Sequence, residues 1–171
     1  NFRKLETQIT QQKLNTELNK IIDSRIDYEN KYNSEKSKYD TYTLQLDSLN
    51  NLLEEVKGVF LKVDMDYLFY KAEVDVLKYL YEKEIVDNSH HSSEDHLDND
   101  HTNTNQSNYK NSLDKLNTLK LSKEKVEKNI SILEEVIKNI SKSLKFAEDD
   151  LKKYLKSVTL LTTKIEKLDR N

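Results

Sequence analysis

Apolar and tyrosine residues recur along most of this chain at alternating spacings of four and three residues. Two runs show the pattern, and only Arg25 and Glu35 in the first of them are charged. Such heptad spacing is typical of helices that pack side by side, so both runs are predicted to be α-helical. The first seam is Leu14, Leu18, Ile21, Arg25, Tyr28, Tyr32, Glu35, Tyr39, Tyr42, Leu46, Leu49, Leu53, Val56, Phe60, Val63, Tyr67, Tyr70, Val74, Leu77 and Tyr81. The second seam is Val126, Ile130, Leu133, Ile137, Ile140, Leu144, Ala147, Leu151, Tyr154, Val158, Leu161, Ile165 and Leu168.

Turn-forming residues are nearly absent, which excludes a β-rich fold. The 171 residues include one glycine and no proline, whereas sheets need such residues at frequent turns. The predicted fold class is therefore all-α, and the length suits one domain, residues 1–171.

The number of helices depends on whether the first run breaks at Gly58. A glycine after Lys57 is a common helix end, but a glycine within a helix costs only about 1 kcal/mol, so both outcomes are open. A continuous first helix would outreach the second and leave an overhang with little to bury. Residues 59–81 are apolar on nearly all sides, which is typical of a helix covered by several neighbours.

Further apolar residues off the second seam widen the face that needs cover: Ile132, Val136, Phe146 and Leu160. We therefore expect an elongated up-and-down bundle of three or four long helices, with residues 59–86 near its centre.

Residues 88–108 separate the two runs and consist mainly of Asn, Ser, Asp and His. They have too little apolar surface to offset the entropy of ordering, so a flexible low-complexity loop is predicted. All four histidines (His90, His91, His96 and His101) lie there among carboxylates, which allows a zinc site as the alternative. Their spacing matches no structural zinc pattern, so we expect no metal.

Motifs for catalysis, nucleotide binding or cofactor binding do not occur in the sequence. Arg25 and Glu35 are interpreted as a polar layer on the seam, with a catalytic pair as the weaker alternative. Basic and acidic residues number 28 and 31, for a net charge of −3 without a basic stripe, which disfavours nucleic acid. A non-enzymatic protein without cofactors is expected.

Seven of the ten tyrosines fall on the first seam, where each buried hydroxyl needs a polar partner or water. The bundle should therefore be only modestly stable and able to open. Opening of the bundle would expose apolar side chains to a membrane or a partner. The candidate residues are Phe60, Leu68, Phe69, Val76 and Leu80. The charges between Lys62 and Lys78 exclude a simple transmembrane helix.

An Asn/His/Asp/Ser insert between helices rich in Lys, Glu, Asn, Ile and Tyr resembles proteins of malaria parasites. Among these, a cysteine-free helical domain of this size is similar to the family of the microneme protein that sporozoites need for cell traversal. That resemblance implies a four-helix bundle, secretion from a parasite organelle or onto its surface, and host-cell traversal or invasion through a membrane or receptor.

The alternative function is that of a coiled-coil scaffold whose helices pair with another helical chain. The two functions differ in whether the apolar seams are satisfied within the chain. A monomer is expected from the first, and an elongated dimer from the second.

Overall fold

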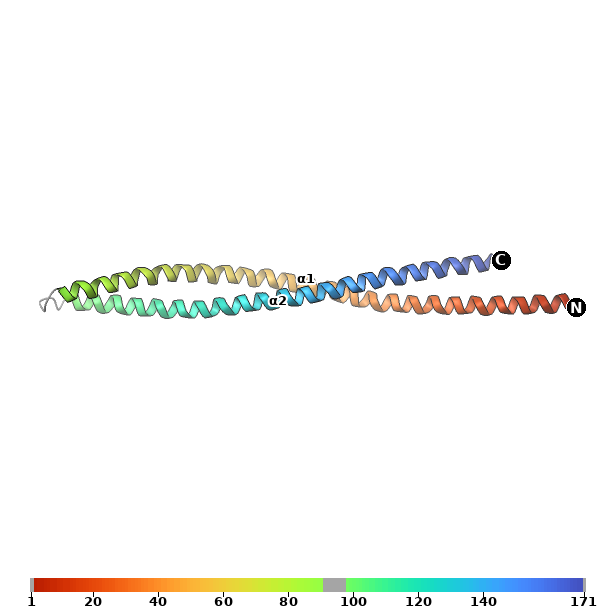
Figure 1. Cartoon of the computed structure of the whole chain (residues 1–171), viewed down its shortest axis with the longest axis horizontal. Coiled ribbons are helices and arrows are strands. Elements are labelled where there is room, and N and C mark those ends of the chain that lie inside the picture. Colours follow the sequence, from red (N-terminus) through yellow and green to blue (C-terminus); the bar gives the residue numbers. More distant parts are fainter. Residues whose placement is uncertain (1, 91–97, 171) are drawn as a thin grey trace. The chain divides into compact units, whose positions relative to one another are not determined.

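Two long helices account for nearly all of the protein in the computed structural model, which describes residues 2–90 and 98–170. Helix α1 is Phe2–His90 and helix α2 is Asp98–Asp169, as Figure 1 shows. The described residues contain no strand. The all-α prediction is confirmed, and the prediction of three or four helices is wrong.

Helix α1 continues through Gly58 without a break. No atom outside the local backbone lies within 4 Å of the position that a Cβ would occupy there. Continuing a helix adds one hydrogen bond per residue, whereas a new helix needs a new nucleus. Because the heptad phase is unbroken on both sides of Gly58, the modest penalty of one glycine does not end the helix.

The chain forms two compact units, each made of one segment of α1 and one of α2. One unit is Asn50–Glu135, which we call the middle unit. Its segments are antiparallel, because contacts that move up α1 move down α2. Asp64 contacts Lys123, Glu73 contacts Ser112, and Glu84 contacts Asn105.

The other unit, Asn1–Leu49 with Val136–Asn171, we call the terminal unit. Tyr28 packs against Tyr154 at a ring-centre distance of 6.3 Å, and Leu44 and Leu49 line a shallow groove with Ile140, so these segments are also antiparallel. Residues 2–17 of α1 are exposed throughout. The overhang that the sequence argument disfavoured is therefore present, as a continuation of a helix already nucleated by its paired part.

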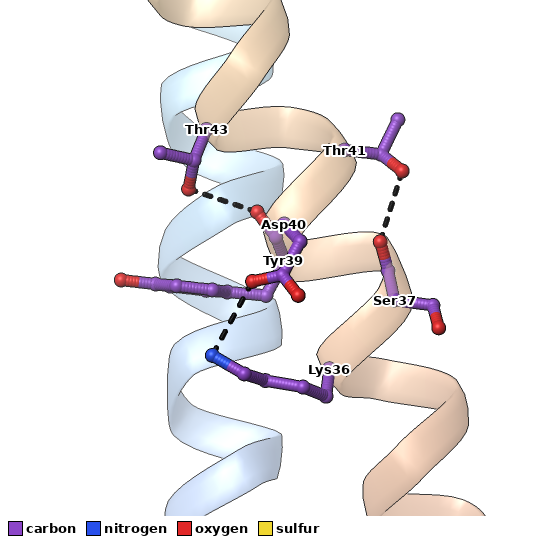
Figure 2. Close-up of polar contacts among 6 residues, drawn as sticks. All are labelled: Lys36, Ser37, Tyr39, Asp40, Thr41 and Thr43. Carbon is purple, nitrogen blue, oxygen red and sulfur yellow. Dashed lines mark hydrogen bonds and ion pairs between the residues drawn. The ribbon is translucent and has the colours of Figure 1, made fainter.

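Side chains around Tyr39 show how the two faces of α1 differ in this unit. In Figure 2, Tyr39 extends from α1 toward α2, whereas Ser37 and Thr41 lie on the other side of α1. The Thr41 hydroxyl donates to the Ser37 carbonyl at 2.9 Å, and Lys36 pairs with Asp40 at 3.3 Å. Polar groups on the outer side are thus satisfied within α1, which leaves the Tyr39 side for α2.

Burial follows the predicted seams closely. Every position of both seams except Leu14 is partly or fully buried. Complete burial is rare, however: among the described residues only Val74, Ala147 and Ile165 are buried apolar residues. Two helices can cover one stripe of each other, and the other faces stay in water.

The loop prediction for residues 88–108 is wrong at both ends. Residues 88–90 belong to α1 and residues 98–108 belong to α2, while residues 91–97 lie outside the described part. Local composition does not account for this helix. The Tyr81 and Tyr109 rings stack at 6.1 Å, and Asn105 donates a hydrogen bond to Glu84, so contacts with α1 support the start of α2.

We expect Gly58→Ala to stabilise the protein. The added methyl group meets no neighbour, and alanine within a helix is favoured over glycine by about 1 kcal/mol. For a chain of this size the melting temperature should rise by about 2–4 °C. Thermal unfolding followed by circular dichroism measures it, and a lower melting temperature would contradict a continuous helix at Gly58.

Candidate interaction surface

A lysine lies near two aromatic rings on the inner face of the middle unit, the side on which α1 and α2 face each other. Lys123 Nζ of α2 is 2.8 Å from Asp64 Oδ1 of α1, 4.8 Å from the Tyr67 ring centre and 6.0 Å from that of Phe60. The hydrogen bond with Asp64 raises the pKa of Lys123 above 10.5. The positive charge of Lys123 therefore lies on the inner face and contributes to the pairing of α1 with α2.

The contact between Asp64 and Lys123 predicts a loss of stability at high pH. A lysine whose folded pKa is raised contributes stability that is complete below its unfolded pKa of 10.5 and is lost as pH rises through the higher folded value. Asp64→Asn should lower the Lys123 pKa and reduce the fall in melting temperature above pH 10.5. NMR titration of the Lys123 side chain measures the pKa, and an unchanged value would contradict the pairing.

Toward the end of α1 the inner face becomes more polar. Ser112 donates to Glu73 at 3.4 Å, and Asn105 donates to Glu84 Oε1. Glu84 Oε2 is buried and accepts no hydrogen bond. Polar groups thus replace apolar ones at several levels, which weakens hydrophobic pairing and leaves side-chain hydrogen bonds to align the helices.

Arg25 and Glu35 are not brought together. Arg25 lies 3.7 Å from Glu29, and Glu35 lies 3.3 Å from Lys38, each within α1. Ten residues of helix separate them, which is about 15 Å of rise. The geometry gives no support to a catalytic pair, and both residues occupy seam positions as expected for a polar layer.

Four of the five candidate residues are already exposed in the closed structure. Leu68, Phe69, Val76 and Leu80 are exposed, whereas Phe60 is half-buried on the seam below Lys123. The predicted central position of residues 59–86 is wrong, because α2 covers only one side of this segment. The off-seam residues of α2 (Ile132, Val136, Phe146 and Leu160) are exposed for the same reason.

A second heptad stripe runs along the uncovered side of α1 in the middle unit. We call it the outer stripe: Leu61, Met65, Leu68, Ala72, Val76 and Tyr79, with Phe69 beside it. Met65 is 71% exposed and Phe69 is 64% exposed. Leu61 follows Phe60 by one residue, and Met65 follows Val63 by two. Each residue turns the helix by about 100°, so both side chains point away from the first seam.

The outer stripe was visible in the sequence as apolar residues on all sides of 59–81, but it was interpreted as the interior of a larger bundle. Its spacing was the missed signal: it alternates between four and three residues except at Val76, which lies one residue past the strict position held by Asp75. A helix with two heptad faces has the pattern for two helical partners, and α2 supplies one of them.

Charges beside the outer stripe are mixed. Residues 61–80 contain three lysines, at 62, 71 and 78, and four carboxylates, at 64, 66, 73 and 75, for a net charge of −1. An amphipathic helix that binds anionic lipid usually has an excess of lysine and arginine on its polar face. The charge pattern favours a protein partner over an anionic membrane surface.

Other kinds of site find little support in the part of the chain that the structure describes. There, no three metal-ligating side chains (His, Cys, Asp or Glu) gather closely enough to hold an ion. The side chains of His90, His91, His96 and His101 lie outside the described set, so the prediction about metal stays a prediction. Within the described residues, neither helix contains a segment apolar enough to cross a membrane.

Comparison with known proteins gives no relative: no family model, curated protein or solved structure matches this chain.

Proposed function

We propose that this protein is a non-enzymatic scaffold that works by pairing helices, with the outer stripe of α1 as its binding surface. The observation that carries the proposal is the outer stripe over residues 61–79, whose members are apolar or aromatic and uncovered, with Asp75 next to Val76. Helix-in-groove and coiled-coil partners recognise such i, i+3, i+4, i+7 arrays of apolar side chains.

The total exposed surface of the chain is large for its mass and leaves room for a partner. The chain exposes 13,451 Å², whereas a globular monomer of this mass exposes about 8,800 Å². The difference exceeds the roughly 1,200–2,000 Å² that a stable interface buries. Exposed apolar side chains that follow one stripe are typical of interaction sites, whereas single scattered ones are not.

Site-specific photo-cross-linking tests the proposal. A photoreactive phenylalanine analogue at Phe69 should cross-link, in an extract of the native cells, to the apolar face of a helical chain. The same analogue at Leu121, an exposed residue on the outer side of α2, is the matched control and should not. Leu68→Lys in the Phe69-labelled protein should abolish the cross-link. Equal cross-linking from both positions would contradict a specific surface.

Host-cell traversal or invasion, which the resemblance to the sporozoite family implies, is a second candidate function. Secretion from a parasite organelle or onto its surface accompanies that candidate. The observation that favours it is the exposure of Leu68, Phe69, Val76 and Leu80, which could contact a membrane or receptor without opening of the structure.

Vesicle binding separates the two candidates. If the membrane function holds, the protein should float with liposomes and release an entrapped dye, and Leu68→Lys with Phe69→Lys should reduce both by about tenfold. Because residues 61–80 carry no positive excess, neutral and anionic vesicles should respond alike. Absence of flotation and leakage with both vesicle types would remove the membrane function and leave a receptor or helical partner.

A further inference from the structure

We propose that α2 binds the surface of an anionic lipid membrane through a row of lysines on its outer side in the terminal unit. The row, which we call the lysine face, consists of Lys138, Lys142, Lys145, Lys152, Lys153 and Lys156. This inference goes beyond the proposed pairing through the outer stripe, because it concerns the other helix and another kind of partner.

The helical repeat places the lysine face on the side of α2 away from α1. Lys138, Lys145 and Lys152 each come one residue after a member of the second seam. Lys142 and Lys156 come five residues after one. At about 100° per residue, these offsets turn the side chains by about 100° and about 140° from the seam residue. All six lysines are exposed, in agreement with this geometry.

Positive charge on the lysine face is largely uncompensated. Residues 136–171 contain nine basic and five acidic residues, for a net charge of +4, whereas residues 1–135 contain 19 and 26, for a net charge of −7. Among the described residues, Lys152 lies 3.5 Å from Glu148, and the other five lysines of the face form no ion pair. Of the carboxylates at positions 148–150, Asp149 alone lies on the outer side.

The lysines do not form a continuous run in the sequence, because seam residues and polar residues separate them. The helical repeat aligns them, so the absence of a basic stripe inferred from the linear sequence does not hold for this side of α2. Charges act over about 8 Å in physiological salt. The local excess of lysine, and not the net charge of −3, therefore determines what the face attracts.

Two apolar side chains beside the lysines favour a membrane as the partner. Phe146 follows Lys145 and is 71% exposed, and Leu160 lies one turn after Lys156 and is 57% exposed. In a helix that lies on a membrane, lysines contact the anionic headgroups, and such apolar side chains enter the boundary between headgroups and acyl chains. A cluster of about four to eight lysines or arginines on a helix is typical of anionic-lipid binding.

The shape and chemistry of the lysine face fit a flat, diffuse anionic surface better than a nucleic acid. From Lys138 to Lys156 the helix rises by about 27 Å. A two-stranded supercoil turns once in about 150 Å, so the row keeps nearly one direction over this length. Headgroups in a plane can contact every lysine, whereas the phosphates of a duplex wind away from the row. Arginine, which binds phosphates and bases in bidentate fashion, is absent from the face.

Flotation of the full chain with liposomes tests the proposal. Phosphatidylcholine vesicles that contain about 30% phosphatidylserine should bind the protein, and vesicles of phosphatidylcholine alone should not. Raising the salt from about 0.1 M to about 0.5 M should release the protein, because the Debye length shortens. Binding at the surface should release no entrapped dye, which separates it from the membrane function considered for the outer stripe.

Substitution of three lysines locates the binding face. The triple variant Lys138→Gln, Lys145→Gln and Lys156→Gln should weaken binding to the anionic vesicles by about 100-fold, at about fivefold per lysine. Glutamine forms helix about as readily as lysine, so the helices should persist. Circular dichroism checks that they do.

Two matched controls accompany this variant. The same charge change at exposed lysines of α2 in the middle unit, Lys110, Lys120 and Lys125, should leave vesicle binding within about twofold of the wild type. Phe146→Ala should weaken binding by about fivefold, because less apolar surface enters the membrane. Phe69→Ala, at a phenylalanine that is 64% exposed on α1, should leave it unchanged.

Equal binding to neutral and anionic vesicles would overturn the proposal, and so would equal weakening by the two sets of lysine substitutions. If the protein binds neither kind of vesicle, the proposal fails. Binding of a DNA duplex or of polyglutamate that the triple variant weakens would then assign the lysine face to a nucleic acid or to an acidic protein. The outer stripe is tested separately by the cross-link from Phe69, so the scaffold function stands or fails independently of these results.

Discussion

Val74→Asp should unfold the middle unit at temperatures at which the wild type is fully helical. Val74 is 5% exposed on the first seam, and a carboxylate there would lie against α2 without a partner. Leaving a charge buried and unpaired costs about 3–5 kcal/mol, a large fraction of the stability of an ordinary domain. Urea unfolding followed by circular dichroism should show a much lower midpoint.

The matched control is Val76→Asp, the same substitution two residues further along α1. Val76 is 58% exposed, so its carboxylate would stay in water, and the loss should be below about 1 kcal/mol. Both variants should be measured at the same low protein concentration. Similar midpoints for the two variants would mean that the first seam is not the face that α2 covers.

Ala147→Leu should destabilise the terminal unit by about 1–3 kcal/mol, because it forces extra volume into a filled position. Ala147 is 3% exposed. It lies between Ile140 and Tyr154 on α2, and the contacts of those residues with α1 place Ala147 near the level of Tyr39. We therefore expect the small side chain of Ala147 to leave space for the Tyr39 ring.

Asp149→Leu is the control for that substitution, since residue 149 is on the exposed side of α2 and offers the new side chain free space. The melting temperature of the Asp149→Leu variant should equal or exceed that of the wild type, because leucine forms helix more readily than aspartate. A stabilising Ala147→Leu would instead show an unfilled space between the helices at this level.

Burial at the positions of the two predicted seams followed from the sequence, whereas the packing of residues 105–123 of α2, which includes the buried Ser112, did not. Heptad spacing determines which residues share a face, because the angle between successive residues in a helix is constant. Tyr28, Glu35 and Tyr42 are therefore on the inner face, whatever their polarity. Leu14 is the exception, because it lies on the overhang, where α1 has no partner.

The candidate residues were only partly predictable for the same reason. Leu68, Phe69, Val76 and Leu80 are exposed, as an interaction surface requires, but Phe60 belongs to the seam. Spacing already separates the two groups, since Phe60 continues the first seam and Leu68 belongs to the outer stripe. What spacing could not say is whether a second helix of the same chain covers that stripe.

The sequence by itself determined the all-α class, the two heptad runs and the faces they present, because these depend on local geometry and on the near absence of glycine and proline. Only the tertiary structure decided that α1 passes through Gly58, that α2 begins at Asp98 and that no other helix within residues 2–90 and 98–170 covers the outer stripe. Those outcomes depend on small differences between opposing free energies. At Gly58 the penalty of one glycine opposes the gain from continuing a helix. At the start of α2 the entropy lost on ordering polar residues opposes contacts such as that of Tyr81 with Tyr109.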